Sequence, residues 1–230
     1  MVKGTKMRRH IGRSATLAVT LGLALGCTAE PAGTMVPIPP PADWAEQLAG
    51  SRASKDEYFR SDPETPLLAQ DVPGFGGLEY WDPDPRYYFV GQVHLYVQPE
   101  RFEVATTSGV IRPCEKVGWL AFAIDGQVQR LQVYRLLDQK PVGGGAGFFL
   151  PFMDGTTGTE TYPAGRYVEL VGPEGGPYVL DFNTASNPWC AYGAVERYVC
   201  PVTPPENRLA VRIEAGERGY RHAPALGAGG

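Results

Sequence analysis

The sequence predicts a mainly β fold, an antiparallel β-sandwich or flattened barrel with one N-terminal surface helix. Two features of the composition support this class. The chain has 29 glycines and 22 prolines, which is 51 of 230 residues, and aromatic residues make up 11%. Such a composition favours short strands joined by tight turns over a helical bundle. The third observation is that strand-like runs do not alternate with long helical segments, which argues against a parallel α/β sheet.

The first 27 residues have the features of a secretory signal that ends in a lipidation site. Basic residues precede an apolar stretch over 17–25, which is too short to cross a bilayer because a spanning helix needs about 20 residues. The stretch ends in Leu-Ala-Leu-Gly-Cys, which resembles a bacterial lipobox. Cys27 is therefore predicted to be the lipidated first residue of the mature protein, and ordinary cleavage after Gly26 or Ala29 is the alternative. We expect an exported protein, lipid-anchored to the bacterial cell membrane or outer membrane and facing the periplasm or the surface.

The rest of the chain divides into a tether, one domain and a tail. Residues 28–41 contain five prolines and are predicted to be an extended tether. Residues 42–221 form a single β-rich domain, long enough to bury a sizeable core, and residues 222–230 form a flexible tail. Loss of residues 1–27 removes five basic residues and no acidic ones, so 16 of 21 basic residues remain against 25 acidic ones and the net charge is −9. Such an acidic protein is expected to bind no nucleic acid, because phosphate binding needs clustered Lys and Arg.

One helix is expected at the start of the domain. Trp44, Leu48 and Phe59 fall near helical spacing. Asp43 stands at the start of this segment, where its side chain can cap the helix. The Asp62-Pro63 step ends it, since a residue before proline disfavours helical backbone. The apolar stripe is weak in its middle, so the helix is predicted to lie on the surface of a sheet.

Eight or nine strands are expected after the helix. The predicted strands cover residues 86–98, 102–106, 120–124, 128–136, 148–152, 165–170, 178–182 and 209–213. Alternation in the first run places Phe89, Leu95 and Val97 on one face. Ser108-Gly109 and Asp125-Gly126 predict hairpin turns, the second with a two-residue loop.

Three cysteines belong to the predicted domain. Export favours disulfide formation, and Cys190 and Cys200 enclose only nine residues. We predict a disulfide between them, which stabilises by about 3 kcal/mol in the chain-entropy account. Cys114 is then the odd thiol and is expected to be buried. No metal and no cofactor is predicted, because the mature chain has only His94 and His222 and lacks a Cys-x-x-Cys motif.

The last quarter of the chain is dense in polar groups, cysteines and turn formers. It contains Asp-Phe-Asn at 181–183, Asn-Pro-Trp-Cys-Ala-Tyr at 187–192, Cys-Pro at 200–201 and Pro-Glu-Asn-Arg-Leu at 205–209. With Lys-Asp-Glu-Tyr-Phe-Arg at 55–60, Gly-Leu-Glu-Tyr at 77–80, residues 152–158, 160–162 and 165–167, and Ala-Gly-Glu at 215–217, these stretches resemble the domain of unknown function 1684 family. The resemblance covers nearly the whole mature domain. It implies a bacterial or archaeal protein of a family with no established activity, so it assigns no chemistry to any residue.

The candidate ligand-binding residues come from the same part of the chain. They are Arg166, Asp181, Asn183, Asn187, Glu206, Asn207 and Arg208. Asp181 and Asn183 point to the same face if they lie in a strand. If the ends of these segments converge, the guanidinium, carboxylate and amide groups form a polar hollow that could hold a carboxylate, a phosphate or a sugar. The alternative is a structural corner, because Asn and Asp hydrogen-bond their own backbone in turns.

Three functions stay open from the sequence. The first is a membrane-tethered, non-enzymatic domain that binds a small polar ligand or an envelope partner. The second is a hydrolase that uses Asp181, Glu206 and Arg166 for acid–base chemistry. The third is a purely structural envelope lipoprotein.

Overall fold

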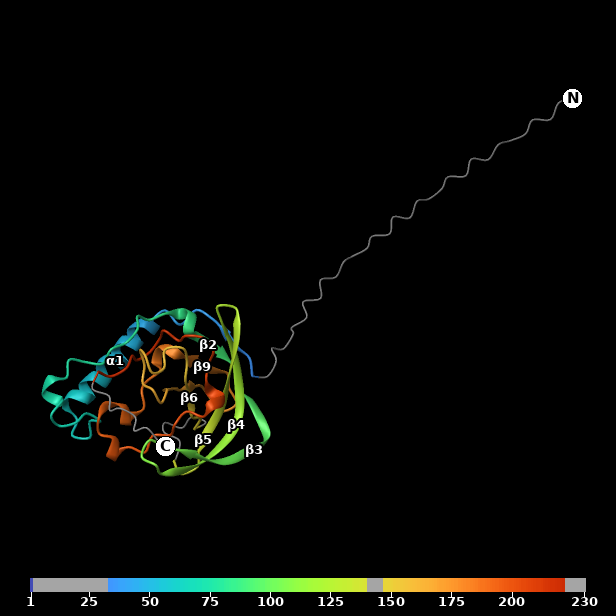
Figure 1. Ribbon diagram of the computed structural model, residues 1–230. Coiled ribbons are helices and arrows are strands. Elements are labelled where there is room, and N and C mark those ends of the chain that lie inside the picture. The colour runs from blue at the N-terminus through green and yellow to red at the C-terminus, as the bar shows by residue number, and fades with distance from the viewer. Residues whose placement is uncertain (2–32, 140–146, 222–230) are drawn as a thin grey trace. The chain divides into compact units, whose positions relative to one another are not determined.

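The computed structural model describes residues 1, 33–139 and 147–221 (Figure 1). The predicted signal sequence with Cys27, the start of the tether and the C-terminal tail lie outside the described residues. The described part is mainly β, with antiparallel sheets and one α-helix, and its strands do not close into a barrel. No helix in this part is both long and apolar enough to cross a membrane.

The elements follow the chain in a simple order. The strands and the α-helix are β1 (Met35–Pro37), α1 (Trp44–Ser61), β2 (Tyr88–Gly91), β3 (His94–Ala105), β4 (Ile111–Ile124), β5 (Gln127–Leu136), β6 (Leu150–Phe152), β7 (Arg166–Val168), β8 (Leu170–Val171) and β9 (Tyr178–Asp181). Short 3-10 helices occur at Val72–Gly74, Pro85–Tyr87, Phe182–Thr184, Trp189–Tyr192, Val195–Arg197 and Pro205–Asn207. The sheets have the strand orders β1-β2-β9-β8, β3-β4-β5 and β6-β7.

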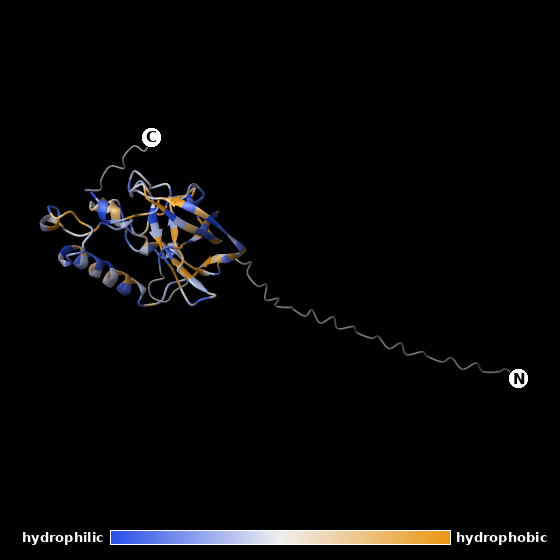
Figure 2. Cartoon of the chain, turned by 90° about the horizontal axis from the view of Figure 1, so that it is seen from below, coloured by the Kyte–Doolittle hydropathy of each residue, from blue (hydrophilic) through white to orange (hydrophobic). Residues whose placement is uncertain are grey.

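The predicted helix is confirmed, but its predicted cap is wrong. Helix α1 begins at Trp44 and ends at Ser61. The Asp43 side chain accepts no backbone N–H of α1; its carboxylate instead accepts a hydrogen bond from Gln47 Nε2 at 2.6 Å. Only Leu48 and Phe59 of the helix are buried, and most of α1 is hydrophilic in Figure 2. The helix is therefore held on the surface by a few contacts rather than by a continuous apolar stripe.

The hairpin predictions are confirmed in the three-stranded sheet. Strands β4 and β5 pair up to Ile124 and Gln127 and are joined by Asp125 and Gly126. Both turn residues have left-handed backbone, with φ of 49° and 76°. This conformation matches the right-handed twist of the flanking strands, which is why an Asp-Gly pair is favoured there. Strands β3 and β4 form the other expected hairpin, with Ala105 opposite Ile111.

The single strand predicted over 86–98 is wrong, because the chain changes sheets within it. Strand β2 pairs with β1 and β9, whereas β3 pairs with β4. The change of sheet breaks the alternation of faces. Phe89 lies in the core, but Leu95 is 54% exposed and Val97 is 99% exposed.

All three sheets contribute to one main hydrophobic core. It includes Phe89 and Leu180 of the four-stranded sheet, Leu120 and Leu131 of the three-stranded sheet, and Phe152 of the two-stranded sheet. Sheets that share a core in this way cover one another's apolar faces.

The strand predicted over 209–213 is wrong, although its pattern of burial is correct. Leu209, Val211 and Ile213 are buried while the residues between them are exposed. The segment joins no strand pair. Its backbone is paired partly by main chain, since Leu209 N donates to Met153 O at 2.8 Å and Gly155 N donates to Val211 O at 2.9 Å. Buried side chains provide other partners: Gln129 Oε1 accepts from Ala210 N at 3.1 Å, and Asp154 Oδ2 accepts from Ile213 N at 2.6 Å.

Candidate functional site

Arg166 lies at the start of β7 and is bound to the last described segment of the chain. Its guanidinium donates to the carbonyl oxygens of Ile213 at 2.8 Å, Glu217 at 3.1 Å, and Ala215. Nη2 also lies 3.6 Å from the carboxylate of Asp154. Burial lowers the pKa of Arg166 to about 10, opposed by the negative charges of Asp154 and Glu217. The side chain therefore remains a cation at neutral pH and holds three main-chain carbonyls inside the protein.

Asp181 lies at the end of β9 and connects the sheet to α1. Its carboxylate accepts a hydrogen bond from Trp44 Nε1 at 2.7 Å, and others from the backbone and side chain of Asn183 at 2.9 and 2.8 Å. Asn183 in turn forms a two-way contact with the backbone of Asp84, at 2.8 and 2.9 Å. Both predicted site residues thus fix the position of neighbouring elements.

The predicted residues at 206–208 lie beside β5. The side chain of Asn207 accepts from Gln132 N at 2.8 Å and donates to the carbonyls of Gln132 and Pro151 at 2.9 and 2.7 Å. Glu206 forms an ion pair with Lys116 at 3.0 Å. Arg208 is exposed and donates to the Met153 sulfur. Asn207 therefore replaces a missing strand at the edge of β5, while its two neighbours lie at the surface.

The structure does not bring Arg166, Asp181 and Glu206 together. Each has its own set of partners, on the C-terminal segment, on α1 and on β4 respectively. The acidic groups that act on the Arg166 charge are Asp154 and Glu217. The predicted convergence is wrong because the strand ends that carry these residues belong to different sheets or to none.

The predicted disulfide is also wrong, although the two cysteines are neighbours. Cys114, Cys190 and Cys200 are all free and buried. The Cys200 sulfur accepts the backbone N–H of Cys190 at 3.2 Å. A hydrogen bond from Cys200 is the main cause that lowers the pKa of Cys190 to about 7, whereas burial raises the pKa of Cys114 to about 11. The pair is joined by hydrogen bonds rather than by a sulfur–sulfur bond.

A buried carboxylate that the sequence analysis missed is at the centre of another polar cluster. Glu217 accepts hydrogen bonds from Lys55 Nζ, from the Tyr192 hydroxyl and, at 2.9 Å, from Asn187 N. Burial and the charge of Glu217 raise the pKa of Tyr192 well above its usual value, so the hydroxyl stays protonated and donates. Asn187 also donates to Arg218 O at 2.8 Å, and its Oδ1 accepts no hydrogen bond from the described residues. Asn187 was among the predicted site residues. Lys55 and Glu217 appeared only within the stretches at 55–60 and 215–217 that carry the family resemblance, and neither was assigned a role.

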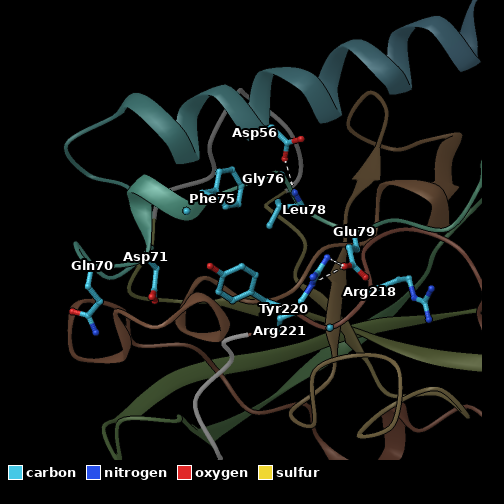
Figure 3. A pocket seen from close by; sticks show the side chains of 13 residues that line it. Asp56, Gln70, Asp71, Phe75, Gly76, Leu78, Glu79, Arg218, Tyr220 and Arg221 are labelled. Atoms are coloured by element: carbon cyan, nitrogen blue, oxygen red, sulfur yellow. Dashed lines mark hydrogen bonds and ion pairs between the residues drawn. The ribbon is translucent and has the colours of Figure 1, made fainter.

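A cavity of about 460 Å³ adjoins this cluster and is called the α1 cavity here (Figure 3). It is lined by Asp56, Gln70, Asp71, Gly74, Phe75, Gly76, Gly77, Leu78, Glu79, Arg218, Gly219, Tyr220 and Arg221. Figure 3 shows α1 along one side, with the Arg218–Arg221 segment opposite. The walls thus carry charges of both signs, aromatic rings and glycine backbone.

The walls of the α1 cavity are held by local contacts. Asp56 accepts a hydrogen bond from Leu78 N at 3.0 Å. Gly77 has a φ of +115°, and a Cβ there would lie 3.0 Å from the Asp56 carboxylate. This position favours glycine for both reasons. Arg221 donates to Glu79 at 2.9 Å, as the dashed lines in Figure 3 show.

Two further cavities lie near predicted site residues. One, of about 250 Å³, is lined mainly by apolar side chains but includes Trp44, Asp181 and Glu169. The other, of about 650 Å³, is lined by Arg112, Trp189 and Cys200 among others. Asp181 has three hydrogen bonds within the protein, so its carboxylate is already engaged.

Comparison with known proteins places the chain in a family. The profile described as "Protein of unknown function (DUF1684)" matches residues 73–218, more than half of the chain. This chain belongs to the DUF1684 family. An uncharacterized protein of Haloarcula marismortui, solved by solution NMR, is 34% identical, with a TM-score of 0.57 over 76% of this chain and 94% of that one. No curated protein matches.

The DUF1684 match covers only part of the lining of the α1 cavity. It includes the wall from Gly74 to Glu79, the buried Glu217 and the adjoining Arg218, but it begins after α1 and ends before Tyr220. The predicted resemblance to the family is confirmed. The helix that supplies Lys55 to the Glu217 cluster and Asp56 to the cavity comes from outside the matched range.

Proposed function

We propose that this protein is an exported lipoprotein whose domain binds a small polar ligand in the α1 cavity. The observation that carries the proposal is the cavity itself, about 460 Å³ in volume, whose lining includes the carboxylates of Asp56, Asp71 and Glu79 and the guanidinium groups of Arg218 and Arg221. Concave sites with a few converging polar groups are the usual places for small-molecule binding. The fold alone assigns no function, so the argument rests on these side chains.

Arg218 is the group best placed to receive an anionic part of the ligand. Its guanidinium lies 5.4 Å from the ring centre of Trp81 and forms no ion pair with a carboxylate of the described residues. Arg221, by contrast, is paired with Glu79. A guanidinium offers two parallel donors to a carboxylate or phosphate. We therefore expect the ligand to place an acidic group on Arg218.

The carboxylates of the α1 cavity define the other end of the ligand. Asp56 and Asp71 line the wall across from the arginines. Asp56 uses one oxygen for Leu78 N, and a carboxylate can accept several hydrogen bonds. A ligand with an ammonium or hydroxyl group a short distance from its acidic group fits this distribution of charge.

Native mass spectrometry of the full chain purified from its own host tests the binding proposal. The wild-type protein is expected to carry a bound small molecule that is lost in Arg218→Ala and kept in Arg208→Ala. The second variant is a matched control, because Arg208 is also exposed and its side chain donates a hydrogen bond to Met153, away from the α1 cavity lining. Retention of the molecule in Arg218→Ala would place it elsewhere. Absence of any bound molecule, even after incubation with a host small-molecule extract, would contradict the proposal.

Lipid attachment is a separate part of the proposal and has its own test. Its support is the basic start of the chain, the short apolar stretch and the small residue before Cys27. One lipidated cysteine would hold the domain on a proline-rich tether at the membrane surface. Wild-type cells fed with labelled palmitate are expected to label the protein, and Cys27→Ser cells are not. Equal labelling of the two proteins would contradict the anchor.

A further inference from the structure

The geometry points to a second site in this protein: the sulfurs of Cys190 and Cys200 form a two-sulfur site for a soft monovalent metal ion, Cu(I). The inference is independent of the α1 cavity, because it involves other residues and another hydrophobic cluster.

The two cysteines are held together by the fold. Cys190 lies in the 3-10 helix Trp189–Tyr192 and is fully buried, and Cys200 is 7% exposed. Cys200 Sγ lies 3.2 Å from the backbone nitrogen of Cys190, and the two side chains share a hydrogen bond. Both belong to a compact cluster with Tyr162, Ala164 and Ala191. The nine intervening residues thus fold back and bring two free thiols together without a covalent link.

The donor set selects the class of metal. Thiolate sulfur is a soft ligand that favours Cu(I) among the biological metals when no oxygen or nitrogen ligands accompany it. Zn²⁺ needs about four ligands, and in the described part of the chain no group of three or more His, Cys, Asp or Glu side chains is positioned to hold a metal. Cu(I) can be bound by two sulfurs in a line, so the pair is sufficient for it.

The surroundings suit the charge of the bound form. Two thiols and one Cu(I) ion form a bis-thiolate complex of net charge −1 and release two protons, with no change of oxidation state. The Arg112 cation acts on Cys200 and offsets negative charge on its sulfur. The buried hydroxyl of Thr107, which has no hydrogen-bond partner of good geometry within the described part of the chain, adjoins Cys190. It can donate to a thiolate once the thiol proton has been displaced.

The site can be reached from solvent. Cys200 lines the cavity of about 650 Å³ between the β3–β4 hairpin and the segment that carries Trp189. The aromatic side chains of Trp189 and Tyr198 contact each other beside it, with ring centres 5.3 Å apart. A metal ion carried by a small thiol could therefore exchange with Cys200 through this cavity, and the aromatic walls would keep bulk water from the buried Cys190.

Competition against a Cu(I)-specific chelator tests the inference. The full chain is used with Cys27→Ser in every variant, under a reductant and without oxygen. The otherwise wild-type protein is expected to hold one Cu(I) per chain, and Cys190→Ser and Cys200→Ser are each expected to weaken binding by at least 100-fold. Cys114→Ser is the matched control, because Cys114 is also a buried free thiol but belongs to another cluster. It is expected to bind Cu(I) as tightly as the parent.

Two further measurements guard against variants that do not fold. Cu(I) is expected to raise the thermal unfolding midpoint of the parent and of Cys114→Ser, because a ligand that binds only the folded state stabilises it. X-ray absorption of the parent complex is expected to show two sulfur ligands and no nitrogen ligand. No rise in the midpoint, equal loss of binding in Cys114→Ser, or a nitrogen-rich metal environment would each overturn the inference.

Discussion

The guanidinium of Arg166 donates a hydrogen bond to the main-chain carbonyl of Ile213 at 2.8 Å, across 47 residues of sequence. The same side chain reaches the carbonyls of Ala215 and Glu217. A buried cation thus binds three carbonyls of the 213–217 segment. Other backbone groups of the segment have main-chain partners: Trp81 N donates to Gly216 O at 3.1 Å, and Glu217 N donates to Ala185 O at 2.8 Å. Together these contacts explain how the segment can lie inside the protein without belonging to a named strand.

Replacing Arg166 should therefore unfold the protein rather than abolish a function selectively. Arg166→Met leaves three carbonyls and the Asp154 carboxylate buried without their partner, which should cost about 3–5 kcal/mol of unfolding free energy. Urea unfolding measures this cost. Arg208→Met is the control at the exposed Arg208, and should change the unfolding free energy by at most about 0.5 kcal/mol. Similar small effects for both variants would show that Arg166 is not structural.

Asn207 should be a second structural residue. Asn207→Leu has nearly the same shape but loses the three hydrogen bonds to Gln132 and Pro151. Buried groups left without partners should lower the unfolding free energy by about 3 kcal/mol. Chemical denaturation would measure it, with Glu206→Gln as the neighbouring control, since Glu206 makes a partly exposed ion pair that should be worth about 1 kcal/mol or less. A larger effect for Glu206→Gln than for Asn207→Leu would refute this account.

The sequence predicted local structure well and long-range contacts poorly. Helix α1, the Asp125-Gly126 hairpin and the mainly β class follow from local spacing and turn chemistry, which a single sequence displays. The change of sheet between β2 and β3 could not be predicted in this way, because the two faces alternate equally well in both halves of the predicted strand over 86–98. The segment at 209–213 alternates buried and exposed residues as a strand does, because one of its faces is buried.

The candidate site shows the same limit. The polar residues near Asp181 were predicted to be ligand-binding candidates, with a structural corner as the alternative. Which group meets which depends on contacts over 100 residues or more, such as Trp44 with Asp181. Glu217 was missed because a lone glutamate near the end of a chain has no pattern that marks it as buried. Only the folded chain shows that Lys55 of α1 meets it.

The Lys55–Glu217 pair should behave as a coupled unit. Lys55→Met leaves the Glu217 carboxylate buried without its cation and should lower the unfolding free energy by about 2–3 kcal/mol. The double variant Lys55→Met/Glu217→Gln removes both charges and should recover part of that loss. A double-mutant cycle in urea measures the coupling. Additive effects of the two single variants would contradict a direct interaction.

Acid should weaken the ion pair between Arg112 and Asp138. The hydrogen bonds from Arg112, at 2.7 and 2.9 Å, lower the pKa of Asp138 below its usual value. Because the folded-state pKa lies below that of the unfolded chain, the pair stabilises fully above about pH 4 and loses its effect as the pH falls through the folded-state pKa. The Asp138 side chain is 39% exposed, so solvent screening limits the effect to about 1 kcal/mol.

Urea unfolding of the wild type and of Asp138→Asn between pH 3 and pH 7 would check this. The wild type should be the more stable protein at pH 7, and the difference should shrink as the pH falls below 4. A difference that stays constant over the whole range would mean that the ionised Asp138 contributes nothing.

Chemical-shift mapping tests the central claim, ligand binding in the α1 cavity, most directly. Amide spectra of the full, isotope-labelled chain would be recorded before and after addition of a small-molecule extract from its host. The account predicts shifts concentrated at the amides of Gly74–Glu79 and Arg218–Arg221, which line the cavity. Shifts concentrated instead around Arg166, Asp181 and Asn207, or no shifts at all, would contradict it.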